Sequence, residues 1–157
     1  MIVTNIGIIL YSETGNTLSV AERLKTALLN KGHSVSLLKV EAEKAAEGSA
    51  VPVRLIAEPD TSAFDALIFA SPVQAFSLAP AMKLYLSRIA SLKGKKVYCF
   101  VTQHLKKNWM GGNRSIRQIQ TLCRAKGAEA ASGGIIHWSH AQREAQIDSV
   151  IKKVGAI

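Results

Sequence analysis

The sequence predicts an α/β protein, a three-layer α/β/α sandwich built around a five-stranded parallel sheet. Apolar runs that begin with β-branched residues alternate along the chain with segments whose apolar residues recur at helical spacing. Strands and helices in this alternation form βαβ units, whose right-handed crossovers place helices on both faces of the sheet. A length of 157 residues is accounted for by one domain spanning 1–157.

The first half of the chain contains two of the expected strands and one helix. Residues 6–11 form an uninterrupted apolar run, as expected of a strand buried on both faces. The next segment carries one apolar stripe and ends at Gly32, the stripe consisting of Leu18, Ala21, Leu24, Ala27 and Leu28. Residues 33–40 follow as the second strand. The pattern of 41–63 is weaker and indicates a short helix at 41–48, a short strand at 53–57 and turns.

The second half repeats the alternation. Residues 66–70 are the third strand, and Pro80 stands where a helix can begin. Residues 95–102 form the fourth strand, and an amphipathic helix with Ile116, Ile119, Leu122 and Cys123 follows and ends at Gly127. The fifth strand falls within 130–137. A closing helix uses Ile147, Val150, Ile151 and Val154.

Composition limits the class of protein. A hydrophobic content of 48% with 20% charged residues is typical of a folded globular domain. The apolar runs are shorter than a membrane span and the N-terminus lacks signal-peptide features, so we expect a soluble, cytoplasmic protein without a membrane partner. Cys99 and Cys123 belong to no metal-ligand pattern and are expected to be buried, reduced thiols, with no metal site.

The segment SETGNT follows the first expected strand and opens the first expected helix. Free backbone N–H groups and the positive end of the helix dipole favour an anion there. Gly15 permits an unusual backbone conformation, and short polar side chains surround it. Walker, GxGxxG and cysteine-phosphatase patterns are all absent from the sequence. A simple capping role for Asn16 or Thr17 is the alternative interpretation.

With these residues the segment resembles the T/S-x-T-G-x-T phosphate loop that binds FMN in the flavodoxin family. The resemblance implies the strand order 2-1-3-4-5, with FMN held by the loops that follow strands one, three and four. It implies a phosphate site made by Ser12, Glu13, Thr14, Gly15, Asn16 and Thr17. Glu13 is expected to contribute its backbone, because its charge repels a phosphate.

The resemblance extends to the two later loops. The segment 71–80 is similar to the loop that passes beside the flavin ring, which implies contacts from Ser71, Pro72, Val73, Gln74, Ala75 and Phe76. The third loop implies contacts from Thr102, Gln103, His104, Trp109, Gly111 and Gly112. Phe76 and Trp109 are the stacking candidates. Core packing is the alternative for Phe76, and contact with a nucleic acid or a protein is the alternative for Trp109.

The charge of this chain differs from that of electron-carrying flavodoxins, which are usually acidic. The net charge is +9, and residues 66–128 contain eleven Lys or Arg and no Asp or Glu. A basic site stabilises reduced, anionic flavin, so we expect a higher potential for the second reduction step than in acidic flavodoxins. The same field could attract NAD(P)H or an acidic protein through Lys106, Lys107, Arg114 and Arg117, or simply form a solvated basic face.

The functional hypothesis is an FMN-binding electron-transfer protein or a reductase of a small, quinone-type acceptor. Its partners would be a redox protein, or NAD(P)H with a small acceptor. The flavin performs the redox step itself, so no separate catalytic residue is predicted. The alternative is a flavin-free basic α/β module that binds nucleic acid or an acidic protein.

Overall fold

The predicted strand order is confirmed by a computed structural model that describes residues 4–43 and 53–157. Five parallel strands lie in the order β2-β1-β5-β7-β8. Their bounds are β1 Asn5–Leu10, β2 Ser34–Lys39, β5 Ala66–Gln74, β7 Lys96–Gln103 and β8 Ala130–His137. Counting these five strands in chain order gives the order 2-1-3-4-5, with the first and third strands adjacent at the centre.

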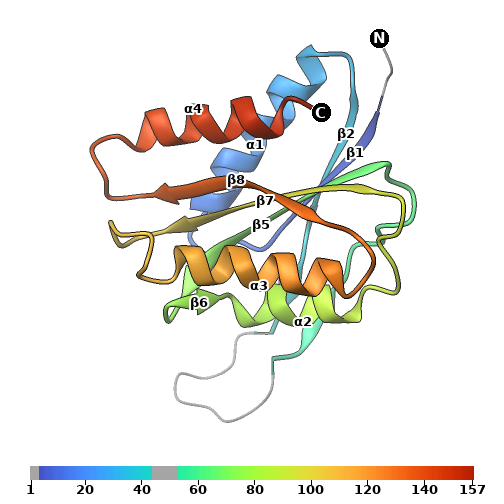
Figure 1. Ribbon diagram of the computed structural model, residues 1–157, viewed down its shortest axis with the longest axis horizontal. Helices are drawn as coiled ribbons and strands as arrows, with labels where there is room; N and C mark the ends of the chain where they lie inside the picture. Colours follow the sequence, from blue (N-terminus) through green and yellow to red (C-terminus); the bar gives the residue numbers. More distant parts are fainter. Residues whose placement is uncertain (1–3, 44–52) are drawn as a thin grey trace.

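Two helices cover each face of the sheet, which gives three layers (Figure 1). Helices α1, Asn16–Asn30, and α4, Arg143–Val154, lie on one face, whereas α2, Pro80–Arg88, and α3, Gly112–Arg124, lie on the other. The three central strands β1, β5 and β7 are largely buried on both sides, so they contribute to two separate cores. In β1, Ile8 packs into the core under α1 and α4, while Ile9 packs into the core under α2 and α3.

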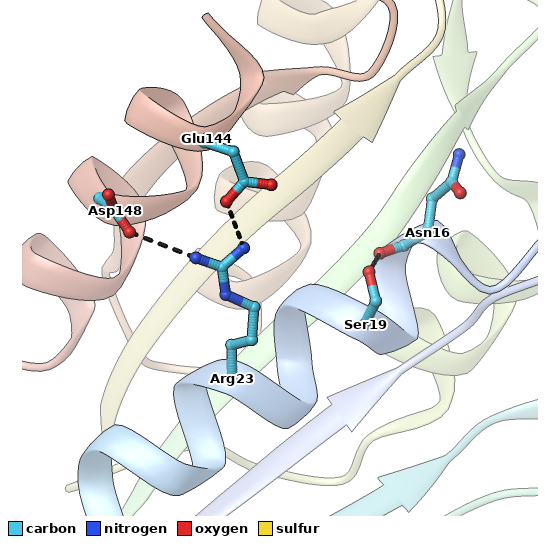
Figure 2. A network of polar contacts seen from close by, with 5 residues as sticks. All are labelled: Asn16, Ser19, Arg23, Glu144 and Asp148. Atoms are coloured by element: carbon cyan, nitrogen blue, oxygen red, sulfur yellow. Dashed lines mark hydrogen bonds and ion pairs between the residues drawn. The ribbon is translucent and has the colours of Figure 1, made fainter.

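Helices α1 and α4 are also joined at their solvent-facing sides. Arg23 of α1 reaches Glu144 at 2.8 Å and Asp148 at 3.3 Å, both on α4 (Figure 2). All three side chains are well exposed, so this network contributes little to stability. The network does, however, pair the Arg23 cation with the carboxylates of Glu144 and Asp148 on this face of the molecule.

The prediction that the third strand ends at residue 70 and continues as a loop is wrong. β5 extends to Gln74 and turns back into β6, Ser77–Leu78, as an antiparallel hairpin. Pro72 lies within the strand and pairs with Thr102 of β7. The polar residues and proline suggested a loop, but pairing with the longer neighbour β7 continues the strand.

The short helix expected at 41–48 is wrong at its start, because Glu41–Ala42 forms strand β3. β3 pairs with β4, Leu55–Ala57, in a separate two-stranded antiparallel sheet. The rest of that predicted helix, from residue 44, lies outside the described residues. The short strand expected at 53–57 is confirmed by β4.

The fifth strand is confirmed at Ala130–His137 despite its two glycines. The pairing register between β7 and β8 shifts opposite Cys99 and Phe100, where Gly133 and Gly134 lie. A Cβ at Gly133 would come within 2.5 Å of Val154, so the glycine allows α4 to pack closely on the bulged strand. Within residues 4–43 and 53–157, no helix has the length and apolar character needed to cross a membrane.

Candidate functional site

Three loops meet at the carboxyl edge of the sheet and enclose a cavity of about 380 Å³. The loops follow β1, β5 and β7, the three central strands, at the point where the direction of strand succession reverses. The cavity is lined by Glu13, Thr14, Asn16, Pro72, Val73, Gln74, Thr102, Gln103 and His104. All nine belong to the residues that the sequence assigned to the three loops.

A second hollow of about 460 Å³ lies at the opposite, amino-terminal edge, beside Pro59, Tyr85 and Lys95. It is larger, but two of its three cations already have partners. Arg88 is paired with Glu58 at 2.6 Å, and Lys95 donates to the backbone oxygens of Ser62 and Phe64. Ligands of parallel sheets bind outside the carboxyl ends of the strands, so the smaller cavity is the better candidate.

The first loop presents backbone donors that the protein does not use. Gly15 precedes α1 with a φ of +89°, and no side chain caps the first turn of this helix. A Cβ built at Gly15 meets nothing within 4 Å, which leaves open space beside the uncapped amides. The Ser12 hydroxyl is buried without a hydrogen-bond partner among the described residues. An anion in this bend would satisfy both kinds of group.

The side chains around Gly15 point in different directions. The Asn16 side chain extends away from the helix, and its backbone oxygen accepts a hydrogen bond from Ser19 (Figure 2). The Glu13 carboxylate accepts a hydrogen bond of 2.6 Å from the Tyr11 hydroxyl. Burial, followed by the Glu13 carboxylate, raises the pKa of Tyr11 above its ordinary value, so the phenol stays protonated and continues to donate. The Glu13 carboxylate is thereby held by Tyr11, the residue that precedes the SETGNT segment.

Thr17 has a partner within the protein. Its buried hydroxyl lies 2.8 Å from the hydroxyl of Thr102 at the end of β7. This contact joins the first turn of α1, directly after the first loop, to the end of β7, directly before the third loop. The structure therefore places Thr17 between the two loops, while Thr14 and Asn16 line the cavity itself.

The second loop is the tip of the β5–β6 hairpin. Ser71 is buried in β5 and donates to the backbone oxygen of Pro72. Ala75 and Phe76 have positive φ values of 48° and 63°, the pattern of a type I′ turn, which usually contains Asn or Gly. Holding two residues with Cβ atoms there costs roughly 1–2 kcal/mol each. The Phe76 side chain is 58% exposed, so the core-packing alternative is wrong.

The third loop is braced from inside. The Gln103 side-chain amide donates to the backbone oxygens of Leu105 and Lys107 at 2.8 and 2.7 Å. His137, at the end of β8, donates from Nδ1 to the Leu105 oxygen at 2.9 Å, and its Nε2 contacts the Asn108 side chain. These contacts hold the loop in one conformation. Trp109 is displayed from it with 75% of its surface exposed.

Gly111 and Gly112 allow close approach, and the structure fills that space with protein atoms. A Cβ at Gly111 would lie 2.6 Å from Val73 and 2.7 Å from the backbone of Phe76. At Gly112 it would lie 2.4 Å from Oε1 of Gln103. Gly111 therefore fits the third loop against the hairpin, whereas Gly112 lets the start of α3 approach Gln103 of β7 and Ile135 of β8.

Several members of the site were not found from the sequence. Tyr11 holds Glu13, His137 and Asn108 brace the third loop, and Gln118 of α3 accepts from Ser77 Oγ and the Leu78 amide. These partners lie far apart in the chain, apart from Tyr11 and Glu13, and no motif marks them. In the described residues, no group of three or more His, Cys, Asp or Glu side chains is arranged to hold a metal ion.

No family model matches the chain, and no curated protein is detectably similar in sequence. Solved structures, however, match along almost the whole length. Oxidised flavodoxin 2 from Bacillus cereus has a TM-score of 0.67 at 19% identity, covering 96% of each chain. Fusobacterium nucleatum flavodoxin bound to flavin mononucleotide has a TM-score of 0.63 at 15% identity, covering 98% of each.

The Trp repressor binding protein from Bacillus subtilis is similar in the same way, with a TM-score of 0.65 at 16% identity, covering 94% of this chain and 99% of that one. At these identities the likeness concerns the arrangement of the backbone. Together with the strand order and the three converging loops, it identifies the architecture of this chain as the flavodoxin-like fold.

Proposed function

We propose that this protein binds FMN and uses it either to carry electrons or to reduce a small acceptor of the quinone class. The observation that carries the proposal is the cavity between the three loops, with the uncapped start of α1 and the unpartnered Ser12 hydroxyl at one end. Its volume lies within the usual range for cofactor sites. Solved structures of the same fold are described as bound to FMN.

In this proposal the phosphate lies at the first loop. The amides of residues 13–16 and the Ser12 hydroxyl donate to its oxygens, and the positive end of α1 favours its charge. Pro72, Val73 and Gln74 line one wall of the cavity and Thr102, Gln103 and His104 another, so the ring would lie between them. When bound, the flavin supplies the redox chemistry, and the chain holds it and excludes water.

The ring-stacking roles of Phe76 and Trp109 belong to this proposal and depend on the position of their loops. Neither side chain lines the cavity, although both project from loops that do. Gly111 of the third loop lies against the Phe76 backbone at the hairpin tip. In this proposal the second and third loops therefore move together when either closes on a flavin ring. Gly111 and Gly112 would then contribute through loop position.

Titration with FMN, followed by quenching of flavin fluorescence, tests the proposal. Gly15→Ala places a methyl group in the open space beside the uncapped amides and strains the backbone, so its FMN affinity should fall roughly tenfold or more. Gly94→Ala is a matched control, because Gly94 also has a positive φ of 81° and open space around it, but lies in the turn before β7 at the opposite edge. Equal losses in both variants, or no binding by the unmodified protein, would reject the proposed site.

Ser12→Ala gives an independent readout on the FMN-free protein. Removing a buried hydroxyl that has no hydrogen-bond partner among the described residues should leave the free energy of unfolding unchanged or raise it by up to about 1 kcal/mol. FMN affinity should fall in the same variant. A loss of stability without a loss of affinity would assign Ser12 to folding instead.

A flavin-free basic module is the second candidate, favoured by the exposure of Trp109 within a loop that also carries Lys106 and Lys107. Protein that ignores FMN but binds DNA with a steep dependence on salt would support it. If FMN binds, turnover of a small quinone with NAD(P)H separates a reductase from an electron carrier.

A further inference from the structure

Exposed apolar side chains occur on two of the three loops that line the candidate cavity. Of the five large apolar side chains that are exposed in the described part of the chain, three lie on the second and third loops. Phe76 is 58%, Leu105 41% and Trp109 75% exposed. Leaving such groups in water forgoes the stabilisation of burial, and clustered exposure is typical of an interaction surface.

The backbone that carries these side chains is held in place. Leu105 receives two hydrogen bonds at its carbonyl oxygen, from Gln103 and His137. Ser139 donates to the His104 oxygen at 2.6 Å, and Gly111 fits against the Phe76 backbone. A surface that is already ordered loses little conformational entropy when a partner binds.

The cations around these loops have no carboxylate partner in the described part of the chain. Arg23, Arg54, Arg88 and Arg124 each form an ion pair with a carboxylate (Figure 2 shows that of Arg23). In contrast, four exposed cations of the third loop and the start of α3 form no ion pair with any described carboxylate, namely Lys106, Lys107, Arg114 and Arg117. Arg114 and Arg117 are three residues apart on α3 and lie on the same side of that helix.

We infer that these seven residues form one docking surface for a protein with an acidic face, and we call it the basic apolar surface: Phe76, Leu105, Lys106, Lys107, Trp109, Arg114 and Arg117. Exposed Trp, Phe and Leu supply the buried centre of such an interface, and the cations form its charged rim. The complementary partner carries carboxylates around an apolar centre. This inference rests on the proposed function, because the surface borders the cavity assigned to FMN.

A protein partner fits the surface better than a nucleic acid. Leu105 offers no face on which a base can stack, and the apolar groups border a cavity at which a docked protein could bring its own redox centre close to the flavin. Lys106 and Lys107 lie on the third loop, and Arg114 and Arg117 lie in the first two turns of α3. Single-stranded DNA is therefore the competing ligand in the test.

The test measures binding of an acidic [2Fe–2S] ferredoxin to the FMN-loaded protein by calorimetry at low and at physiological ionic strength. The expected result is binding that weakens as salt rises and that becomes roughly tenfold weaker when Lys106, Lys107, Arg114 and Arg117 are all changed to Glu. The matched control changes Lys93, Lys96, Lys152 and Lys153 to Glu, which alters the net charge equally at the opposite end of the sheet. Binding should fall much less in this control.

A second pair of variants tests the apolar centre. Leu105→Ser should weaken ferredoxin binding with little change in its salt dependence, whereas Leu29→Ser, at an exposed position on α1, should not. Equal losses in the two charge variants, salt-independent or absent ferredoxin binding, or tighter binding of a single-stranded DNA oligomer than of ferredoxin would overturn the inference. The FMN titration is scored separately, so a protein that binds FMN but not ferredoxin rejects the docking surface alone.

Discussion

The hydroxyl groups of Thr17 and Thr102 lie 2.8 Å apart in a buried position and join the first turn of α1 to the end of β7. The two residues are 85 positions apart in the chain. Their contact links the loop proposed to hold the phosphate to the loop proposed to border the flavin ring. The geometry of the candidate site therefore depends on packing between the first and third loops.

This contact predicts a non-additive effect on stability. Thr17→Val or Thr102→Val alone leaves one buried hydroxyl without a partner and should lower the free energy of unfolding by about 1–3 kcal/mol. The double variant should be less destabilised than the sum of the single variants, because no unsatisfied hydroxyl remains. Denaturant unfolding of all four proteins completes the cycle, and additive losses would contradict the proposed contact.

The interlock of the second and third loops predicts a strong effect at Gly111. Gly111→Ala would push a methyl group to within 2.6 Å of Val73 and 2.7 Å of the Phe76 backbone, at a φ of +114°. We expect a loss of unfolding free energy well above the roughly 1–2 kcal/mol of backbone strain alone. Gly94→Ala carries the strain without the clash and sets that baseline. Similar losses at the two positions would show that the hairpin moves aside at little cost.

The buried thiols predict a decline of stability at alkaline pH. Burial raises the pKa of Cys99 and Cys123 from about 9 to about 12, and for Cys99 the neighbouring Cys123 adds to the effect. Between pH 9 and pH 12 the unfolded thiols lose protons that the folded protein retains. The free energy of unfolding should therefore fall as pH rises through this window, by up to about 1.4 kcal/mol per pH unit for each thiol.

Measurements of the free energy of unfolding from pH 8 to pH 11 check this decline, because they give the slope of that free energy against pH directly. The double variant Cys99→Ala, Cys123→Ala will be less stable overall because it leaves cavities in the core under α3, yet its slope between pH 9 and pH 10 should be shallower. Tyr11 and Tyr85 also have raised pKa values, so a slope above pH 10 should persist. An unchanged slope in the double variant would contradict the assignment to the thiols.

The unpaired cations predict a shift in the second reduction potential of bound FMN. One charge at about 10 Å in water changes the energy of an anion by about 0.4 kcal/mol, or roughly 20 mV for one electron. Changing Lys106, Lys107, Arg114 and Arg117 to Glu should lower that potential by an amount on the order of tens of millivolts, and salt should reduce the shift. Anaerobic titration measures it, with the variant of Lys93, Lys96, Lys152 and Lys153 as the control.

Most of the fold could be predicted from the sequence because local patterns record which side of each element is buried. The helical stripes of α1, α3 and α4 and the apolar run of β1 from Ile6 to Leu10 follow directly from burial against the sheet. SETGNT marked the first loop because its glycine and short polar side chains are required locally by the bend itself. The extension of β5 beyond residue 70 was missed, because pairing with β7 outweighed the signal of Pro72.

By itself, the sequence determined the α/β alternation, the position of the bend at Gly15 between the first strand and the first helix, and the concentration of cations between residues 66 and 128. The tertiary structure alone decided that Thr17 meets Thr102, that His137 braces the third loop, and that Gly111 contacts the chain at Phe76. The physical reason is that these contacts join residues brought together only when parallel strands align their carboxyl ends. Such partners leave no periodic pattern along the chain.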